Sequence, residues 1–280
     1  DETEGMDYYS FGVRLNFTGW QSFLVPRSRF DTSRQPRGWD QIDRFYFIAS
    51  GWGNTPDPEV VLHVDGVVMT DEVPRGPVMQ MAEFFSLFRD DVPELSEFHK
   101  AVAEKDFGKA QILLAHYYRM RSSVPWTFDP HEVDRSISFS RRRADDAVKA
   151  RVSVIGIPYT FPDSTVDWQY NLTFDRADLA NNREWGVQLN RMSFWRDLGR
   201  AYWATGDEVY AQAFAVQLRG WIEQCPRPSS GRSGFAPAWR TIEAGIRLTS
   251  VWMECWHRFL HSPSLSDEDL MMFLMSIAEQ

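Results

Sequence analysis

The feature that most constrains the fold is a change of hydrophobic periodicity at about residue 73. After it, apolar residues recur at helical spacing in stretches that short loops join. The clearest pair is 185–204 and 208–224, separated by the turn "TGD". In that turn Gly206 suits the position just after a helix end, and Asp207 suits the cap of the next helix. This pair therefore predicts a helical hairpin.

Other parts of the same region also show helical spacing, and they are residues 77–90, 107–122, 238–261 and 267–280, with a weaker pattern at 145–154. Repeated hairpins are typical of an α/α bundle, a solenoid or a toroid. The sequence has no internal repeat of fixed period, which argues against a regular helical array. We therefore predict a mainly α-helical domain over residues 73–280.

The first part of the chain, residues 1–72, has the pattern of β-strands. Residues 12–18 alternate, residues 43–50 form an aromatic strand pattern, and residues 59–69 have a strand rhythm. Turn-forming sequences lie between these stretches. The order resembles the closing half of a jelly-roll module of the kind attached to carbohydrate-active enzymes. So few strands predict only part of a β-sandwich domain.

Composition and charge exclude several functional classes. A formal net charge of −9 argues against a general nucleic-acid binder, although an anion site needs only local positive charge. No run of about 18 apolar residues occurs, so we predict no membrane-spanning helix. Cys225 and Cys255 form neither a disulfide framework nor a metal-ligand spacing. His257 and His261 have helical ligand spacing but no third ligand nearby in the sequence, so we expect no metal.

Aromatic residues make up 15% of the chain, and twelve of them are Trp. An excess of this kind occurs where rings stack on sugars, and it also occurs in large aromatic cores. The composition leaves both interpretations open.

A charged stripe runs along the stretch 238–261. One helical face carries Arg240, Glu243, Arg247, Ser250, Glu254, Arg258 and His261. The opposite stripe is more apolar and consists of Ile242, Ile246, Thr249, Met253, Trp256 and Leu260. The charged stripe has two interpretations. It is a solvated face with i,i+4 pairs worth about 0.2–0.5 kcal/mol each, or it is the wall of a site where Glu243 orients an arginine toward a carboxylate or sulfate.

The neighbouring stretch "NREWGVQLNRMSFWRDLGRAYW" adds a dense local supply of cations: Arg183, Arg191, Arg196 and Arg200. Its apolar residues Trp185, Leu189, Met192 and Trp195 predict a core-facing stripe. Surface arginines are the ordinary interpretation, and an acidic ligand is the alternative.

Four stretches in order resemble heparinase II/III-type polysaccharide lyases, particularly the heparan-sulfate lyase branch. They are "DFGKAQILLAHYYRMR" (106–121), "VDWQYN" (166–171), "REWGVQLNRMSFWRDLGRAYWATGDEVYAQAF" (183–214) and "WRTIEAGIR" (239–247). The resemblance implies an incomplete (α/α) toroid of helical hairpins, preceded here by the partial β-sandwich. It covers about 105–260, and it favours a cleft wall for the charged stripe more strongly than the periodicity alone does.

The resemblance also implies an activity: β-elimination on an acidic, uronate-containing polysaccharide. Such an enzyme neutralises the uronate carboxylate, removes the C5 proton with a base and protonates the departing 4-oxygen. No cofactor is implied. The motif positions that match, and that we expect around the sugar, are Arg191, Trp239, Arg240, Glu243 and Arg247. The family's proton-transfer motifs lie downstream of the last matching helix, so we assign no catalytic residue and expect this chain to be a fragment.

The remaining expectations follow from the implied substrate. We expect an anionic polysaccharide as partner, neither nucleic acid nor membrane, and a periplasmic or secreted location. Two alternatives stay open: a non-catalytic protein that binds uronate oligosaccharides, and a hydrolase on a helical toroid. The hydrolase would need two carboxylates that face each other across a cleft, for which Asp167 and Glu243 are loose candidates.

Overall fold

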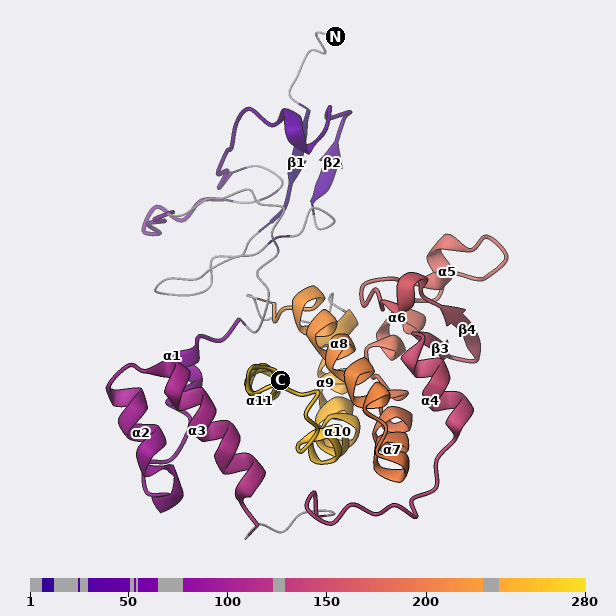
Figure 1. Cartoon of the computed structure of the whole chain (residues 1–280). Coiled ribbons are helices and arrows are strands. Elements are labelled where there is room, and N and C mark those ends of the chain that lie inside the picture. The colour runs from indigo at the N-terminus through magenta and orange to yellow at the C-terminus, as the bar shows by residue number, and fades with distance from the viewer. Residues whose placement is uncertain are drawn as a thin grey trace. The chain divides into compact units, whose positions relative to one another are not determined.

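A computed structural model describes residues 7–12, 25, 30–50, 53, 55–64, 78–122, 129–228 and 237–280. The chain separates into two compact units, Asp1–Asp71 and Glu72–Gln280 (Figure 1). The described part is mainly helical, and all of its long helices lie in the second unit. The assignment of the units as a β-sandwich domain and a toroid domain stays a prediction.

In the first unit, two short strands pair around an aromatic cluster. β1 (Tyr8–Ser10) runs antiparallel to β2 (Asp31–Ser33), with Tyr8 opposite Ser33. A 3₁₀ turn, Trp39–Gln41, places Trp39 against Tyr9, with the ring centroids 4.1 Å apart and nearly parallel. Phe30 meets the same indole edge-on. These contacts between half-buried rings help to hold the hairpin together.

The expected strand at 43–50 is wrong in this structure. Residues 42–50 join no described strand, and Phe45, Tyr46 and Phe47 are each more than half exposed. Residues 55–64 also have no strand partner among the described residues. A strand needs a neighbouring edge to satisfy its backbone groups, and a favourable residue pattern does not supply one. The rest of the expected strands, 13–18 and 65–69, lies outside the described residues.

The second unit contains the helices α1 (Met81–Phe85), α2 (Ser96–Ala103), α3 (Phe107–Met120), α4 (Arg141–Val148), α5 (Leu172–Asp175), α6 (Arg183–Leu189), α7 (Trp195–Thr205), α8 (Glu208–Gln224), α9 (Thr241–Ile246), α10 (Trp252–Phe259) and α11 (Asp267–Glu279). Short 3₁₀ turns occur at Pro93–Leu95, Pro162–Ser164 and Pro237–Trp239, and a π-helical turn, Arg247–Val251, joins α9 to α10. One β-hairpin, β3 (Arg151–Val154) with β4 (Ile157–Thr160), follows α4.

The predicted hairpin of α7 and α8 is confirmed, together with its turn chemistry. Gly206 ends α7 in the left-handed region at φ 72°, and its N–H donates to the Tyr202 carbonyl. The Asp207 side chain accepts a hydrogen bond from Val209 N at 3.1 Å and caps α8. α7 also packs against α4 and α10, so it lies between neighbours on several sides (Figure 1).

Two predicted helices differ from the structure in informative ways. The stretch 185–204 is broken, because Met192 adopts φ 54° between α6 and α7, and a left-handed residue cannot continue an α-helix. The stretch 145–154 is the end of α4 followed by β3. The left-handed Ala150 separates the two. The stretches 107–122, 238–261 and 267–280 are helical within a few residues of the predicted ends, whereas 77–90 is helical only at Met81–Phe85.

Tryptophan builds the core of the second unit. Every described Trp there is at most 7% exposed: Trp168, Trp185, Trp195, Trp203, Trp221, Trp239, Trp252 and Trp256. Indole N–H groups inside the core donate to buried acceptors, such as Trp195 to Gln217 and Trp221 to Asn190, both at 2.8 Å. Of the two explanations for the aromatic excess, the structure therefore supports the large core.

The remaining sequence predictions that the fold can address are simple. Cys225 and Cys255 are both free and buried. The predicted core-facing stripe of α6 and α7 is confirmed, because Trp185, Leu189, Met192 and Trp195 are fully buried. Within the described ranges, no helix combines the length and apolar character that crossing a bilayer requires.

Candidate functional site

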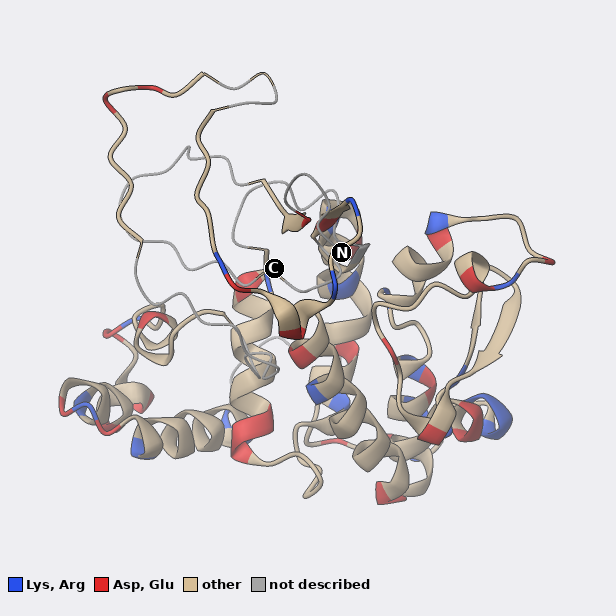
Figure 2. Cartoon of the chain, turned by 90° about the horizontal axis from the view of Figure 1, so that it is seen from above, with Lys and Arg blue, Asp and Glu red and all other residues tan. Residues whose placement is uncertain are grey.

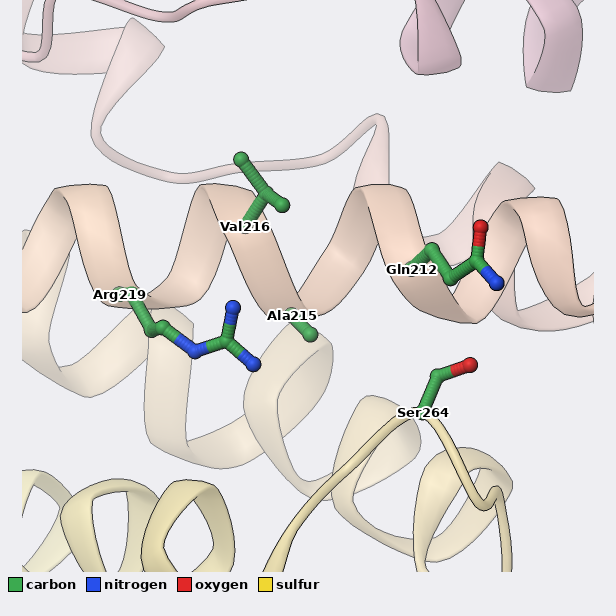
Figure 3. Close-up of a pocket in the computed structure, with 5 residues that line it drawn as sticks. All are labelled: Gln212, Ala215, Val216, Arg219 and Ser264. Carbon is green, nitrogen blue, oxygen red and sulfur yellow. The ribbon is translucent and has the colours of Figure 1, made fainter.

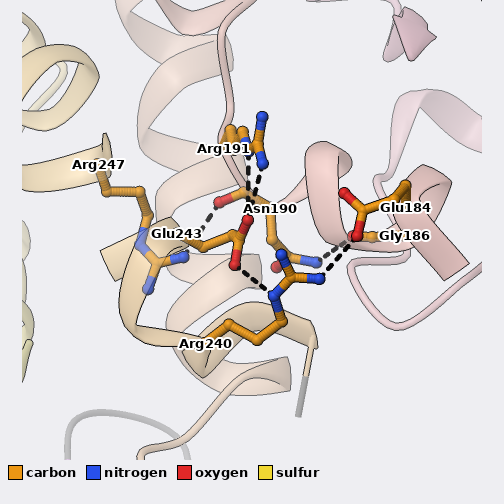
Figure 4. A network of polar contacts seen from close by, with 7 residues as sticks. All are labelled: Glu184, Gly186, Asn190, Arg191, Arg240, Glu243 and Arg247. Atoms are coloured by element: carbon orange, nitrogen blue, oxygen red, sulfur yellow. Dashed lines mark hydrogen bonds and ion pairs between the residues drawn. The ribbon is translucent and has the colours of Figure 1, made fainter. Parts of the chain in front are cut away.

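The candidate site lies where the segment from α6 to α7 meets α9. Asn182 caps α6 by accepting a hydrogen bond from Glu184 N, which places Glu184 in the first turn of that helix. Arg191 follows in the break after α6, and Arg240 is the cap residue of α9. Glu243, in the first turn of α9, projects between them (Figure 4).

Glu243 binds two arginines at once. Its Oε1 accepts hydrogen bonds from Arg191 Nη2 at 2.9 Å and Nε at 3.3 Å. Its Oε2 forms an ion pair with Arg240 Nε at 2.9 Å, and Arg240 Nη1 donates to Glu184 Oε1 at 2.7 Å (Figure 4). The carboxylate is fully buried, whereas the side chains of Arg191 and Arg240 are 26% and 33% exposed. A buried acid therefore orients two guanidinium groups that reach the solvent.

Arg247 lies deeper than these two arginines. It is fully buried, and its guanidinium carbon is 4.9 Å from the Trp221 ring centre and 5.6 Å from that of Trp252. Arg247 Nη1 donates to the Asn190 carbonyl at 3.1 Å, and Nη2 donates to the Gln280 side chain. Burial lowers the pKa of Arg247 to about 10. Cation–π contacts and carbonyl acceptors stabilise its charge within the core.

The charged stripe of the helix faces inward, which corrects the predicted faces. Glu243 and Arg247 are fully buried and Arg258 is 7% exposed, although His261 of the same stripe is exposed. The apolar stripe is buried at Trp256 and Leu260, whereas Ile242 is 55% exposed. The expected pair Glu254–Arg258 is present at 3.1 Å. Glu243 instead pairs with Arg191 and Arg240. The solvated-face interpretation is therefore wrong for Glu243 and Glu254, because both are largely buried against arginines of the segment from α6 to α7.

The exposed rim of the site is held by a further ion pair. The hydrogen bond from Arg240 lowers the pKa of Glu184, and Glu184 in turn raises the pKa of Arg240. Arg191 and Arg240 balance Glu184 and Glu243, and the one excess positive charge of the network belongs to the buried Arg247. The partly exposed guanidinium groups still offer N–H donors that suit a carboxylate or sulfate.

The comparison that decides the family covers this whole region, because a family model described as heparinase II/III N-terminus matches residues 84–280. The chain belongs to the heparinase II/III family. Among its relatives, a heparin-sulfate lyase of Pedobacter heparinus is 28% identical over 193 residues, covering 66% of this chain and 28% of the relative. A heparin-sulfate lyase of Bacteroides thetaiotaomicron is 24% identical over 237 residues, covering 78% of this chain and 31% of the relative.

Solved structures of heparinase III share the fold. One, with methylated lysines, matches with a TM-score of 0.59 and 25% identity over 70% of this chain and 32% of that chain. A heparan sulfate lyase structure from Pedobacter heparinus matches with a TM-score of 0.57 and 23% identity, covering 70% of this chain and 31% of that chain. The chain spans about 30% of the length of these curated relatives.

The residues expected around the sugar divide into two groups in this heparinase-family chain. Arg191 and Arg240 are partly exposed and share Glu243. Trp239 and Arg247 are buried, and the Trp239 indole donates to the Cys225 carbonyl at 2.8 Å. Of these four residues, only Arg191 and Arg240 have side chains that are partly open to solvent.

Sequence reasoning missed two members of the network. Glu184 holds the outer side of Arg240, and its signal is an acid in the first turn after the Asn182 cap. Asn190 is buried and donates its side-chain amide to the Trp168 and Gly186 carbonyls at 3.0 and 2.8 Å. A polar residue inside the apolar stripe of α6 and α7 was the available signal for Asn190.

Other candidate sites have weaker geometry. A hollow of about 260 Å³ lies beside α8 (Figure 3). Arg219, which lines it, already binds Asp269 through two nitrogens, at 2.5 and 2.8 Å. The described residues contain no group of three or more His, Cys, Asp or Glu side chains placed to hold a metal ion. Asp167 is exposed and accepts a hydrogen bond from Gln169 N within its own turn. Both oxygens of its proposed hydrolase partner, Glu243, are engaged by arginines.

Proposed function

We propose that this chain is part of a polysaccharide lyase that cleaves an acidic, uronate-containing polysaccharide by β-elimination. The observation that carries the proposal is the pair Arg191 and Arg240, oriented by the buried Glu243 and open to solvent. Guanidinium groups fixed in this way suit carboxylate and sulfate groups. The names of the relatives, heparin-sulfate lyases, point to the same class of substrate.

In the proposed reaction, cationic groups neutralise the uronate carboxylate, which makes the C5 proton more acidic. A base takes that proton, the C4–oxygen bond breaks, and a double bond forms between C4 and C5. An acid gives a proton to the departing oxygen. In this chain Arg191 and Arg240 would bind acidic groups of the substrate, while Glu243, Trp239 and Arg247 position them.

The proton-transfer groups are proposed to lie in the part of the relatives that this chain does not cover, since it spans about 30% of their length. We also propose that the helical hairpins, such as α7 with α8, form part of an (α/α) toroid, with a partial jelly-roll before it. A periplasmic or secreted location follows from a polymeric substrate that is too large to enter the cytoplasm.

The test uses the full-length parent protein on a panel of uronate polysaccharides. We expect a rise in ultraviolet absorbance on at least one polymer, from the unsaturated uronate end. The variants Arg191→Gln and Arg240→Gln should each weaken substrate binding roughly tenfold, equivalent to about 1.4 kcal/mol. Arg183→Gln removes an exposed arginine at the start of α6 and is the matched control.

The possible outcomes separate the alternatives. Binding without any unsaturated product would replace the lyase with a non-catalytic binding protein. Cleavage that yields only saturated ends would indicate a hydrolase. Full binding by Arg191→Gln and Arg240→Gln would remove these two residues from the site.

A further inference from the structure

A second cluster of arginines lies along the same contact, where α7 meets α10. Glu254 of α10 pairs with three arginines: Arg196 at 3.2 Å, Arg200 at 3.3 Å and Arg258 at 3.1 Å. Asp197, the neighbour of Arg196 on α7, pairs with Arg143 of α4 at 3.2 Å. Four arginines thus share two carboxylates.

In this cluster the acidic side chains are mostly buried, and three of the arginine side chains are exposed. The side chains of Glu254 and Asp197 are 14% and 19% exposed, whereas those of Arg143, Arg196 and Arg200 are 63%, 40% and 43% exposed. A further acid, Asp134, lies near Arg258, the buried member of the cluster. The positive charge therefore reaches the solvent, and most of the compensating charge stays beneath it.

The contacts resemble the contact of Arg240 with Glu243, because the arginines approach the carboxylate through Nε. Arg196 and Arg200 each approach Glu254 through Nε. Both side chains are partly exposed, at 40% and 43%, and these ion pairs involve only one nitrogen of each guanidinium. An arginine that is placed by an ion pair through Nε and is partly exposed can offer its other N–H donors to a bidentate anion.

The clusters around Glu243 and Glu254 both contact the segment that contains α6 and α7. Glu243 and Glu254 both face the segment 183–205, and their sequence positions are about 16 Å apart along a helix. Figure 2 shows acidic and basic residues interspersed along the helices of the second unit. In this cluster the three arginines are more exposed than the acids with which they pair.

We propose that Arg143, Arg196 and Arg200 form a second anion-binding surface, which takes sulfate groups of an acidic polysaccharide beyond the Arg191–Arg240 site. The choice of ligand rests on the proposed function. An extended polyanion that occupies the first site can continue along α7 and meet this surface, so affinity would increase with chain length.

The experiment measures binding of this chain to a sulfated heparin oligosaccharide and to the same oligosaccharide without its sulfates. We expect the double variant Arg196→Gln/Arg200→Gln to bind the sulfated form at least tenfold more weakly, with a smaller effect on the desulfated form. The control, Arg89→Gln/Arg176→Gln, makes the same charge change at exposed arginines that pair locally with Asp91 and Asp178. It should retain most of the affinity, because screened net charge alone contributes little.

A second variant separates binding from folding. Arg196→Lys/Arg200→Lys keeps both charges over Glu254 but removes the planar fork, so it should unfold near the parent temperature and still lose several-fold affinity. Equal weakening of the Gln double variant and its control, or unchanged binding by the Gln double variant, would overturn the proposal. The proposed function has a different readout, since a parent that forms no unsaturated product fails as a lyase even if sulfate binding to this surface is confirmed.

Discussion

At the scale of single residues, Glu243 determines the geometry of the candidate site. Its carboxylate is fully buried, and the two arginines that it binds come from segments about 50 residues apart in sequence. Removing a buried ion-pair partner leaves donors without an acceptor, which costs more than losing an exposed pair.

We predict that Glu243→Gln lowers the free energy of unfolding by roughly 1–3 kcal/mol. This loss is smaller than the loss expected for a fully buried ion pair, because Arg191 and Arg240 are partly exposed. Glu184→Gln is the matched control, since its carboxylate is 42% exposed, and it should cost about 0.2–1 kcal/mol. Urea unfolding of both variants gives the comparison, and equal losses would show that Glu243 is no more important than a surface partner.

Local sequence spacing predicts one ion pair of the α9–α10 segment, but it does not predict the ion pairs of Glu243. The pair Glu254–Arg258 follows from helical spacing alone and is present. The pairing of Glu243 does not follow, since its partners Arg191 and Arg240 are placed by the break after α6 and by the start of α9. Spacing within one helix cannot report a partner that lies on another helix.

At the scale of secondary-structure elements, the turn between α7 and α8 shows how local chemistry defines a hairpin. Gly206 has φ 72°, and a Cβ atom there would lie 2.8 Å from Arg135 Nη1. A side chain in the left-handed region is disfavoured even where space is available.

Gly206→Ala should therefore lower the free energy of unfolding by about 1–2 kcal/mol. Gly245→Ala should have the opposite sign. Gly245 lies in α9, where a Cβ would have no neighbour within 4 Å, and alanine in a helix is favoured over glycine by about 0.5–1 kcal/mol. Thermal unfolding of the two variants measures both changes, and a stabilised Gly206→Ala would contradict the assigned role of this turn.

The elements that the sequence did not predict have tertiary causes. The pattern of 185–204 is continuous, yet Met192 leaves the helical region and separates α6 from α7. Its side chain is fully buried and accepts a hydrogen bond from the Trp252 indole at its sulfur, 3.0 Å away. The break at Met192 therefore occurs where this residue contacts α10. The sequence of 185–204 alone contains no signal that predicts the break.

At the scale of the whole molecule, the core belongs to one of the two units. The buried hydrophobic cluster of the described residues runs from Met79 to Met275. Within the second unit, Glu279 accepts a hydrogen bond from Met79 N at 2.5 Å and ties the last helix to the residues before α1. A unit with its own core is expected to fold by itself.

We predict that a chain of residues 72–280 unfolds within about 2 °C of the full chain. A difference of 1 kcal/mol in a unit of this size shifts the midpoint by roughly 2–4 °C. Scanning calorimetry of both chains, with circular dichroism to verify helix content, provides the measurement. A midpoint several degrees lower for the shorter chain would mean that residues 1–71 stabilise the helical core.

By itself, the sequence determined the approximate positions of α3, α8 and α11, the caps at Gly206 and Asp207, and the family. These features depend on residues close together along the chain or on motifs in a defined order. Only the tertiary structure decided that the charged stripe of α9 and α10 faces inward, and that it divides into clusters around Glu243 and Glu254. The physical reason is that a buried charge is stable only beside its partners, and here most of those partners lie about 50 residues away, in α7 and the break before it.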